Sequence, residues 1–424
     1  MSSTMTYKLK NQAKQLIKFC LRFIKRDKGF FFFSPEKALK NAGSNISKLT
    51  SDQELEIITK YKSIGLVVKD DVIYIPLTDG KEREYSGGLI DCKTGILIEE
   101  AIHLKGGPSQ EAPQNINQEI EIEINQTVFL GGMLYDNFGH LLFESISRLW
   151  AYSYVRELDP YIFFYVPWTA PDYLEKNNYA HQIFTGFGIP HKKIIFTNKV
   201  SKFKRVIIAP QKYGNEICKF PDHYFMEFLK TFKFRKSIPK TFEKADKVYV
   251  SRVKIPYGLG KPIGEKYFEA FLESNDYRIF YPELYSVNEQ LTLYANAQKI
   301  IFCDGSALHS CILLYDLKAD IAIVARRKNG KSIADQFVGF GKDFLWIDEV
   351  IKQYQFGLAD WSAVSEINWF EVSSKLLAAG FIENVFTEFS SLNYEEIVTQ
   401  EIKSYIAAIK NRPEFISFLK EAHI

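Results

Sequence analysis

The 424-residue sequence has few cysteines, little net charge and no long apolar run. Its five cysteines, at positions 20, 92, 218, 303 and 311, are scattered and odd in number, which argues against a disulfide framework. The net charge of +3 is too small to indicate nucleic acid as a partner. No apolar run approaches the ~20 residues that cross a bilayer, and there is no signal peptide. We therefore expect a cytoplasmic protein.

Common catalytic and metal-binding motifs are also missing. The sequence has no CxxC pair, HExxH, GxSxG, EF-hand loop or DxD pair of the kind that holds a metal–nucleotide complex. We therefore predict no metal site and no organic cofactor. Several histidines are isolated in the sequence, and we interpret them as structural or surface residues: His103, His181, His191, His223 and His423.

The composition is that of a globular protein, with 46% hydrophobic and 25% charged residues. Residues 64–130 contain several strand-like runs, and after residue 150 strands and helices alternate. A polar linker at 235–246 separates this part from a cleaner alternation, in which repeated strand–helix units predict a parallel sheet covered on both faces. We expect an α/β protein with two Rossmann-like domains facing a cleft, over residues 35–238 and 239–350, followed by a helical extension over 351–424.

Residues 1–34 form a separate segment. Basic and bulky apolar residues are interleaved from Lys8 to Lys28, and the run GFFFF follows at 29–33. A basic amphipathic helix suits the surface of an anionic membrane, whereas the alternative is a terminal helix packed on the protein with a solvated basic face. We favour peripheral attachment to the inner face of the cell membrane.

The stretch from Gly131 to Trp150 has the most unusual pattern. It reads as a glycine turn that leads into a helix from about Asn137, and one stripe of this helix is largely polar. Buried polar groups must be paired, so the stripe either lines a cleft or forms an internal hydrogen-bonded network in which Glu144 and Arg148 are a simple i,i+4 pair. The stripe consists of Asn137, His140, Leu141, Glu144 and Arg148.

Three features of the second α/β unit follow strands, where ligands bind in a parallel sheet. The first is a glycine-rich loop with the cations Arg252, Lys254 and Lys261, which suits an anion. The second is the turn CDGSALHS at 303–310, which is either a phosphate site or an ordinary loop with Ser306 as a helix cap. The third is Glu283, which can accept the hydroxyls of a ribose or lie free in solvent.

These motifs, in this order, resemble glycosyltransferase family 61, which includes bacterial capsular and surface-polysaccharide transferases. The family has a helix with the pattern N-F/Y-x-H followed by an acidic residue and Arg, a strand ending in Ser-Arg, a Pro-Glu pair before a helix with Gln, and a His-Gly-Ala turn. The last motif departs from the pattern, because Asp304 replaces His and Ser306 replaces Ala, and an acidic side chain cannot neutralise phosphate. The matching residues here are Asn137, Phe138, His140, Glu144, Arg148, Ser251, Arg252, Pro282, Glu283, Gln290 and the turn DGSALHS.

The resemblance implies a GT-B architecture and an inverting, metal-independent transfer from a nucleotide sugar, commonly a UDP-sugar, to an oligosaccharide or lipid-linked glycan. We assign His140 as the base, because a neutral imidazole titrates near working pH, with Glu144 to orient it or raise its basicity and Asp136 as the runner-up. Asn137 and Arg148 would position the acceptor or brace the helix. The predicted nucleotide-sugar site comprises Arg252, Lys254, Lys261, Glu283, Gly305, Ser306, Ala307 and His309.

Two other functions stay open at this point. A catalytically inactive nucleotide-sugar-binding or scaffolding component of a polysaccharide assembly complex would have the same architecture, and the departure at Asp304 is the reason to keep it. A nicotinamide oxidoreductase lacks its glycine fingerprint here. The sequence also leaves a homo-oligomer open.

Overall fold

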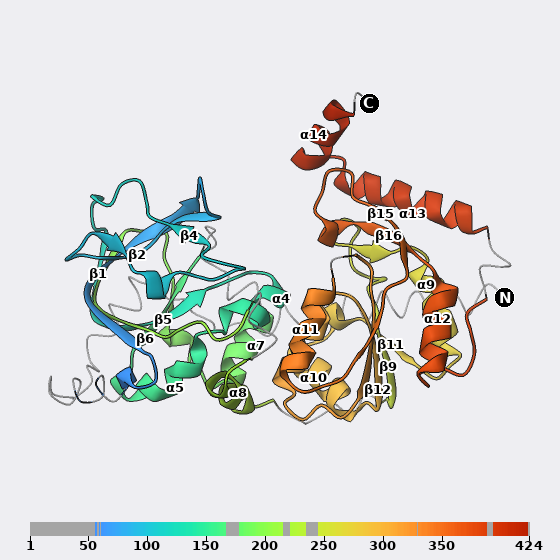
Figure 1. The fold of residues 1–424 in the computed structure, drawn as a ribbon, viewed down its shortest axis with the longest axis horizontal. Coiled ribbons are helices and arrows are strands. Elements are labelled where there is room, and N and C mark those ends of the chain that lie inside the picture. The colour runs from blue at the N-terminus through green and yellow to red at the C-terminus, as the bar shows by residue number, and fades with distance from the viewer. Residues whose placement is uncertain are drawn as a thin grey trace, which may run out of the picture.

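The computed structural model describes residues 56, 59, 61–166, 178–214, 221–234, 245–328, 330–387 and 393–422. The predicted basic helix at 1–34 lies outside these residues, as does most of the predicted linker. Within the described ranges, no helix is long and apolar enough to cross a membrane. The chain is a mixed α/β structure whose two large sheets lie side by side in Figure 1.

The first half is built on an eight-stranded sheet in the order β3-β2-β1-β8-β5-β6-β7, with β4 paired to β2. Strands β8, β5, β6 and β7 run parallel, while β1, β2 and β3 pair antiparallel. The strands are β1 (Val67–Asp79), β2 (Tyr85–Asp91), β3 (Ile96–Leu97), β4 (Gln110–Glu111), β5 (Ile122–Met133), β6 (Tyr161–Tyr165), β7 (Ile194–Ile195) and β8 (Ser201–Ile208).

Strand β6 shows why this sheet is buried on both faces. All five of its residues are buried, and successive side chains point to opposite faces of a strand. Ile162 and Phe164 therefore join one core cluster, and Tyr161, Phe163 and Tyr165 join another. The helical elements of this half are η2 (Glu99–Ala101), α4 (Phe138–His140), η3 (Leu141–Ser145), η4 (Leu149–Ala151), α5 (Tyr152–Val155), η5 (Arg156–Leu158), α7 (Asn178–Gly186), η6 (His191–Lys193) and α8 (His223–Lys230).

The second half has a fully parallel sheet in the order β11-β9-β12-β13-β14. Numbered along the chain this order is 2-1-3-4-5, so the strand order reverses between β9 and β12, where α/β proteins of this order bind ligands. Its elements are β9 (Lys247–Val250), α9 (Glu265–Glu273), β11 (Arg278–Phe280), η7 (Pro282–Leu284), α10 (Val287–Asn296), β12 (Lys299–Cys303), η8 (Ser306–Leu313), β13 (Asp320–Val324), α11 (Lys331–Gly339), β14 (Leu345–Ile347) and α12 (Trp369–Ala378).

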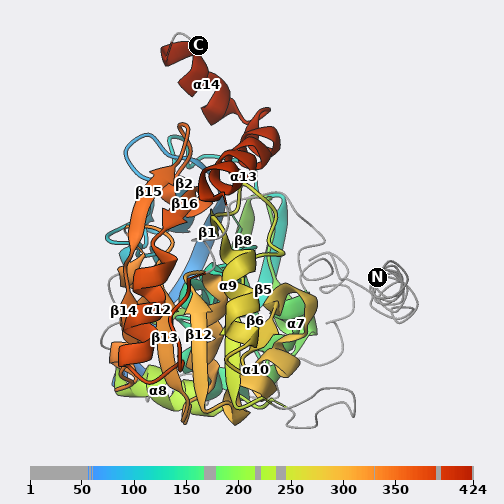
Figure 2. The ribbon, with the colours of Figure 1, turned by 90° about the vertical axis from the view of Figure 1, so that its right-hand side faces the viewer.

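Helices cover both faces of this parallel sheet. Side chains of α9 and α12 pack in one cluster with one face, and side chains of α10, η8 and α11 pack against the other. Figure 2 shows α9 in front of the strands. Local sequence fixes where some of these helices begin: Ser286 and Glu289 form a reciprocal capping box at the start of α10. The alternation predicted for residues 247–326 is confirmed element by element.

The segment predicted to be helical from residue 351 is only partly so. It starts within β15 (Val350–Tyr354) and, after η9 (Asp360–Ser362), continues into β16 (Val364–Ile367). These strands form a small sheet with β10 (Lys261–Pro262). Helices α13 (Tyr394–Ile409) and α14 (Pro413–Glu421) pack near it through a separate apolar cluster, which includes Ile263, Val364 and Phe415.

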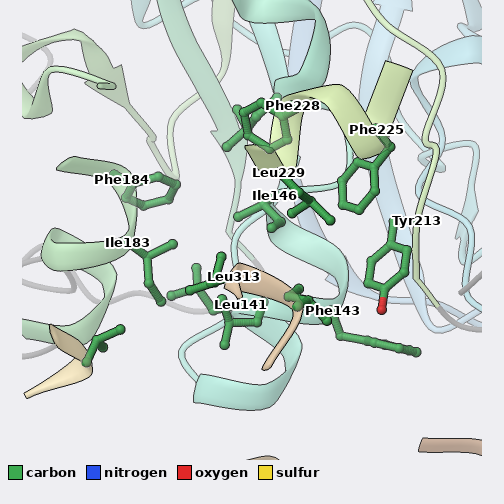
Figure 3. Packing of buried hydrophobic residues seen from close by; sticks show 14 of the residues in the cluster. Leu141, Phe143, Ile146, Ile183, Phe184, Tyr213, Phe225, Phe228, Leu229 and Leu313 are labelled. Carbon is green, nitrogen blue, oxygen red and sulfur yellow. The ribbon is translucent and has the colours of Figure 1, made fainter. Parts of the chain in front are cut away.

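One hydrophobic core joins the two halves. Leu141 and Phe143 of η3 belong to the same buried cluster as Leu313 of η8 (Figure 3), and this cluster also includes Leu308. The ring of Phe143 lies 5.1 Å from that of His309, measured between centroids. The end of β5, which leads into α4, and the end of β12, which leads into η8, are therefore held close to each other.

Candidate active site at the seam between the halves

The predicted polar helix is real but irregular. It begins as one α-helical turn, α4, continues as the π-helical turn η3 and ends in the 3₁₀ helix η4. Asn137 caps the start, because its side-chain oxygen accepts hydrogen bonds from the amides of Gly139 at 2.9 Å and His140 at 3.4 Å. Asn137 thus braces the helix, which is one of the two roles predicted for it. Short π-helical segments are rare and frequently occur at functional sites.

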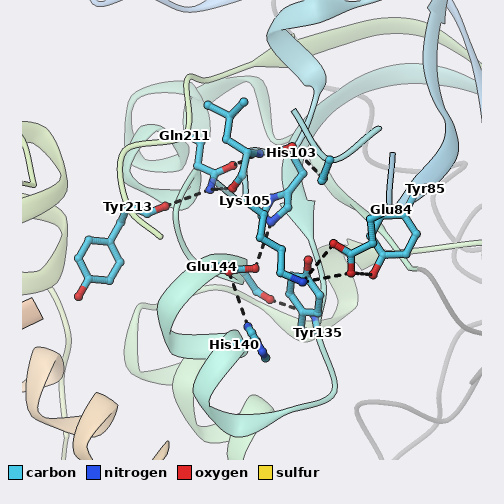
Figure 4. A network of polar contacts seen from close by, with 12 residues as sticks. Glu84, Tyr85, His103, Lys105, Tyr135, His140, Glu144, Gln211 and Tyr213 are labelled. Carbon is cyan, nitrogen blue, oxygen red and sulfur yellow. Dashed lines mark hydrogen bonds and ion pairs between the residues drawn. The ribbon is translucent and has the colours of Figure 1, made fainter. Parts of the chain in front are cut away.

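Glu144 lies at the centre of a polar network behind this turn (Figure 4). Its side chain is 0% exposed, whereas the side chain of His140 is 43% exposed. One carboxylate oxygen lies 3.1 Å from Nε2 of His103, and the other lies 3.6 Å from Nδ1 of His140. Burial raises the pKa of Glu144, but the two histidines outweigh burial and lower the pKa to about 2. An exposed imidazole is therefore backed by an ionised, buried carboxylate.

Of the two interpretations given for His103, structural or surface, the structure shows a buried residue, and this residue contacts Glu144. Its side chain is 1% exposed. The loop that carries it is fixed on both sides, because its own amide donates to Gln110 at 2.8 Å and the amide of Leu104 donates to Gln211 at 3.0 Å. The sequence gives no signal for this contact, which joins residues far apart in the chain.

Arg148 does not line a cleft. It is 1% exposed, and its guanidinium donates to the backbone carbonyls of Glu100 at 2.8 Å, Ile102 at 2.7 Å and Ala209. The predicted Glu144–Arg148 pair is also wrong, since Glu144 contacts the two histidines instead. Arg148 ties the segment before His103 to the end of β8, so its role is to brace.

Asp136 stands immediately before the capped turn and is exposed. Its backbone carbonyl accepts a hydrogen bond from the hydroxyl of Tyr179, which holds the residue beside α7. Asp136 is therefore an exposed carboxylate at the start of the turn that carries His140.

Arg252 and Gly305 meet at the point where the strand order of the parallel sheet reverses. Nε of Arg252 donates to the carbonyl of Gly260 at 2.9 Å, and the second terminal nitrogen donates to Leu259 at 2.5 Å. The remaining nitrogen lies over Gly305, where an added Cβ would come within 2.2 Å of it. Only glycine allows this close approach. The two residues predicted to hold a diphosphate are thus brought together.

Asp304 contacts two further arginines, Arg326 and Arg327. It is fully buried, and its Oδ2 accepts from Nε of Arg327 at 3.0 Å while its backbone carbonyl accepts from Nε of Arg326 at 2.8 Å. Burial and the neighbouring charge of Arg252 lower the pKa of Arg326 to about 9. Nη1 of Arg327 also lies 3.7 Å from Oδ1 of Asp360, and Arg252 lies over the neighbouring Gly305. Three guanidiniums therefore gather at this strand end.

Sequence reasoning missed Arg326 and Arg327. The signal was present, because the strand DIAIV is followed directly by Ala-Arg-Arg, and the ends of parallel strands share one edge of the sheet.

The glycine-rich loop after β9 is fixed by a hydrogen bond within the loop and by another to helix α13. Lys261 is buried, and its ammonium donates to the carbonyl of Val253 at 2.6 Å, so the prediction that it faces a ligand is wrong. On the outer side, Glu401 of α13 accepts from the amide of Gly264 at 3.0 Å. Lys254 remains exposed, with its ammonium 4.1 Å from the centre of the Tyr281 ring.

Glu283, the residue predicted to bind ribose, stands in η7 beside these cations. Partial desolvation raises the pKa of Glu283, and the charges of Arg252, Lys254 and Lys261 oppose that shift. Gln290 donates to the carbonyl of Pro282 at 2.9 Å, which fixes the turn that carries Glu283.

The start of η8 completes the seam. Ser306 and Ala307 are half-buried at its first turn, whereas His309 is buried, with Nδ1 3.1 Å from the side-chain oxygen of Gln336. Burial lowers the pKa of His309 to about 4, so the ring is neutral and packs in the seam instead of facing a diphosphate. A Cβ on Gly139 would lie 2.9 Å from Cβ of Ser306, so α4 touches η8 next to His140.

Comparison with known proteins identifies the class. A sequence model described as Glycosyltransferase 61 matches residues 138–321, from α4 to β13. The chain is therefore a glycosyltransferase. Its matched region, which includes His140, Glu144, Arg252 and Asp304, belongs to glycosyltransferase family 61, so the resemblance seen in the motifs is confirmed.

Other comparisons add little. No curated protein matches the chain. Among solved structures, the dodecameric iron-containing heptosyltransferase TibC, crystallised with ADP-D-beta-D-heptose, matches 67% of this chain and 79% of its own chain at 10% identity. The TM-score is 0.27, and a likeness at that level says nothing further about this protein.

Proposed function

We propose that the protein is an inverting, metal-independent glycosyltransferase of GT-B architecture. It moves a sugar from a nucleotide sugar, UDP-linked in our proposal, to a hydroxyl of a growing bacterial capsule or surface glycan. The observation that carries this proposal is the juxtaposition across the seam. The solvent-accessible imidazole of His140, with the buried carboxylate of Glu144 behind it, stands beside the end of β12, where guanidinium groups gather.

The reaction assigns a task to each side of the seam. Nε2 of His140 takes the proton from the acceptor hydroxyl, whose oxygen then attacks the anomeric carbon from the face opposite the diphosphate. The bond between that carbon and the diphosphate oxygen breaks, and the nucleoside diphosphate leaves with its electron pair. Its charge is stabilised by Arg252 and Arg327 and by the backbone N–H groups at the start of η8, while the buried Arg326 braces the backbone of Asp304.

The domain division follows from the same proposal. Residues 35–238 would bind the acceptor, and residues 239–350 would bind the donor, with Glu283 on the ribose. The reason for keeping an inactive scaffold as an alternative was Asp304, and its pairing with Arg327 gives that residue a place in a cationic site.

Calorimetric titration with UDP, GDP, CMP and NAD tests the proposal. We expect UDP to bind and to compete with the sugar donor, and uridine without phosphates to bind much more weakly. Tight binding of NAD with no binding of a nucleoside diphosphate would contradict the proposal. Binding of UDP without transfer from any UDP-sugar would favour the inactive alternative.

Peripheral attachment to an anionic membrane is a further part of the proposal, and it rests on the sequence of residues 1–34 alone. Each cation near such a surface contributes about 1 kcal/mol, so the cluster from Lys8 to Lys28 suffices for reversible binding. Deleting residues 1–33 should abolish sedimentation with phosphatidylserine vesicles and spare transfer to a soluble acceptor. Equal sedimentation of both proteins would count against it.

A further inference from the structure

We propose that His103 is a positioning residue for the base. It holds the carboxylate of Glu144, and Glu144 in turn sets the orientation and tautomer of His140. The inference rests on the proposed function, because it takes His140 as the group that receives the acceptor proton. His103 belongs to neither the polar helix nor the region matched by the family model.

The geometry places one imidazole at each oxygen of the carboxylate. Nε2 of His103 lies 3.1 Å from Oε2 of Glu144, and both side chains are almost completely buried. On the other side, Nδ1 of His140 lies 3.6 Å from Oε1. That distance is longer than a hydrogen bond, but both atoms are buried and neither has another hydrogen-bond partner among the described residues. Catalytic hydrogen bonds are often long in free enzymes and tighten in the complex.

The surroundings of His103 indicate which ring nitrogen faces Glu144 as a donor. Nδ1 is buried without a hydrogen-bond partner in the described part of the chain, so a proton there would be a buried, unsatisfied donor. The favoured arrangement has the proton on Nε2, which donates to Glu144. Glu144 then stays ionised and accepts the Nδ1 proton of His140. This leaves Nε2 of His140 unprotonated, the form that a base requires.

Few other titratable groups face Glu144. Tyr135, which follows β5, approaches from the sheet, and burial together with the charge of Glu144 raises the pKa of its hydroxyl. Tyr85 on β2 lies beyond it and is also affected by that charge, after burial and Glu84. The segment after β8 contributes Gly214, whose Cα side faces Glu144, and the charge of Lys212 in the same segment is paired with Asp222. The described histidines are thus the groups that keep the buried carboxylate ionised.

The sign of the expected pH effect follows. Burial alone would raise the pKa of Glu144, and removing the hydrogen bond from His103 lets that effect act. Glu144 then becomes protonated at a higher pH, and a protonated carboxyl group no longer holds His140 in its active tautomer. The acidic limb of the pH profile should therefore move to higher pH.

The test compares His103→Phe, which fills the space without a donor, with His103→Gln, whose amide nitrogen can replace Nε2. His191→Phe is a matched control in the same half, since His191 contacts Thr185 at 2.9 Å and lies outside the site. For His103→Phe we expect kcat/KM at neutral pH to fall about ten- to a hundredfold and the acidic limb to move up by about one to two pH units. His103→Gln should recover most of the rate, and UDP affinity should not change in any variant.

Two outcomes overturn the inference: a wild-type pH profile for His103→Phe, or an equal loss in His103→Phe and His103→Gln with an unshifted profile. If His103→Phe does not fold, nitrogen NMR of histidine-labelled wild-type protein decides, and a proton on Nδ1 of His103 contradicts the inference. Failure of the proposed function looks different, because then wild-type protein transfers no sugar or His140→Ala retains full transfer.

Discussion

Arg252 should dominate the affinity for a nucleoside diphosphate, and the structure lets the size of the effect be worked out. Two nitrogens of its guanidinium donate to carbonyls of the glycine-rich loop. The third lies over Gly305, where the strand order of the sheet reverses. A charge-assisted hydrogen bond is worth roughly 1.5–3 kcal/mol. Arg252→Ala should therefore raise the dissociation constant of UDP by about ten- to a hundredfold.

Calorimetry with UDP and uridine measures this directly. Arg252→Lys should also weaken UDP binding, because the single nitrogen of an ammonium does not reproduce the planar fork that reaches two loop carbonyls and Gly305. Lys266→Ala removes the same charge from an exposed position on the neighbouring helix and should change affinity little. Uridine binding should be unaffected by all three changes. Wild-type affinity of Arg252→Ala for UDP would refute the assignment of the donor site to the second half.

Three further predictions concern the seam and its supports. Gly139→Ala should lower turnover by about tenfold or more and leave UDP affinity intact, because the new Cβ would press on Ser306 and displace His140; unchanged kinetics would show that the contact is not needed. Arg148→Ala should lower the free energy of unfolding by about 3 kcal/mol in denaturant titrations, since it leaves buried carbonyls unpaired, and a loss near zero would contradict its bracing role. The ionised Glu144, with its pKa lowered to about 2, contributes stability that is complete above the ordinary glutamate pKa and is lost as pH falls toward 2. The stability gap between wild type and Glu144→Gln should shrink from pH 7 to pH 3, and a constant gap would speak against this coupling.

The second half could be predicted from the sequence because the signals of its strands and helices are local in the chain. Buried parallel strands appear as short apolar runs, and their carboxyl ends must share one edge, so Arg252, Asp304 and Gly305 could be placed in one site without coordinates. The same rule would have found Arg326 and Arg327 had it been applied to β13. The helical prediction for residues from 351 missed β15 and β16, because β16 pairs with β15 on one side and, on the other, with β10, which lies just over a hundred residues earlier in the chain.

The first half was harder because its site depends on contacts between distant segments. A regular helix places Arg148 on the stripe of His140 and Glu144, but the π-helical turn and the 3₁₀ helix that follow change the phase, and Arg148 points into the protein. His103 could not be found, since an isolated histidine in a loop has no periodicity that indicates a partner. Lys261 and His309 carry the right chemistry for phosphate, and only their burial shows that they are used in packing and bracing.

The most direct test of the central claim is sugar transfer by His140→Ala, measured together with its affinity for UDP. The account predicts a loss of turnover of about a hundredfold or more, because general base catalysis is removed, with a UDP dissociation constant close to that of wild type. Asp136→Ala, a change in the neighbouring exposed carboxylate, should retain most of the turnover. Near-wild-type transfer by His140→Ala, with a large loss in Asp136→Ala, would contradict the account and move the base to Asp136.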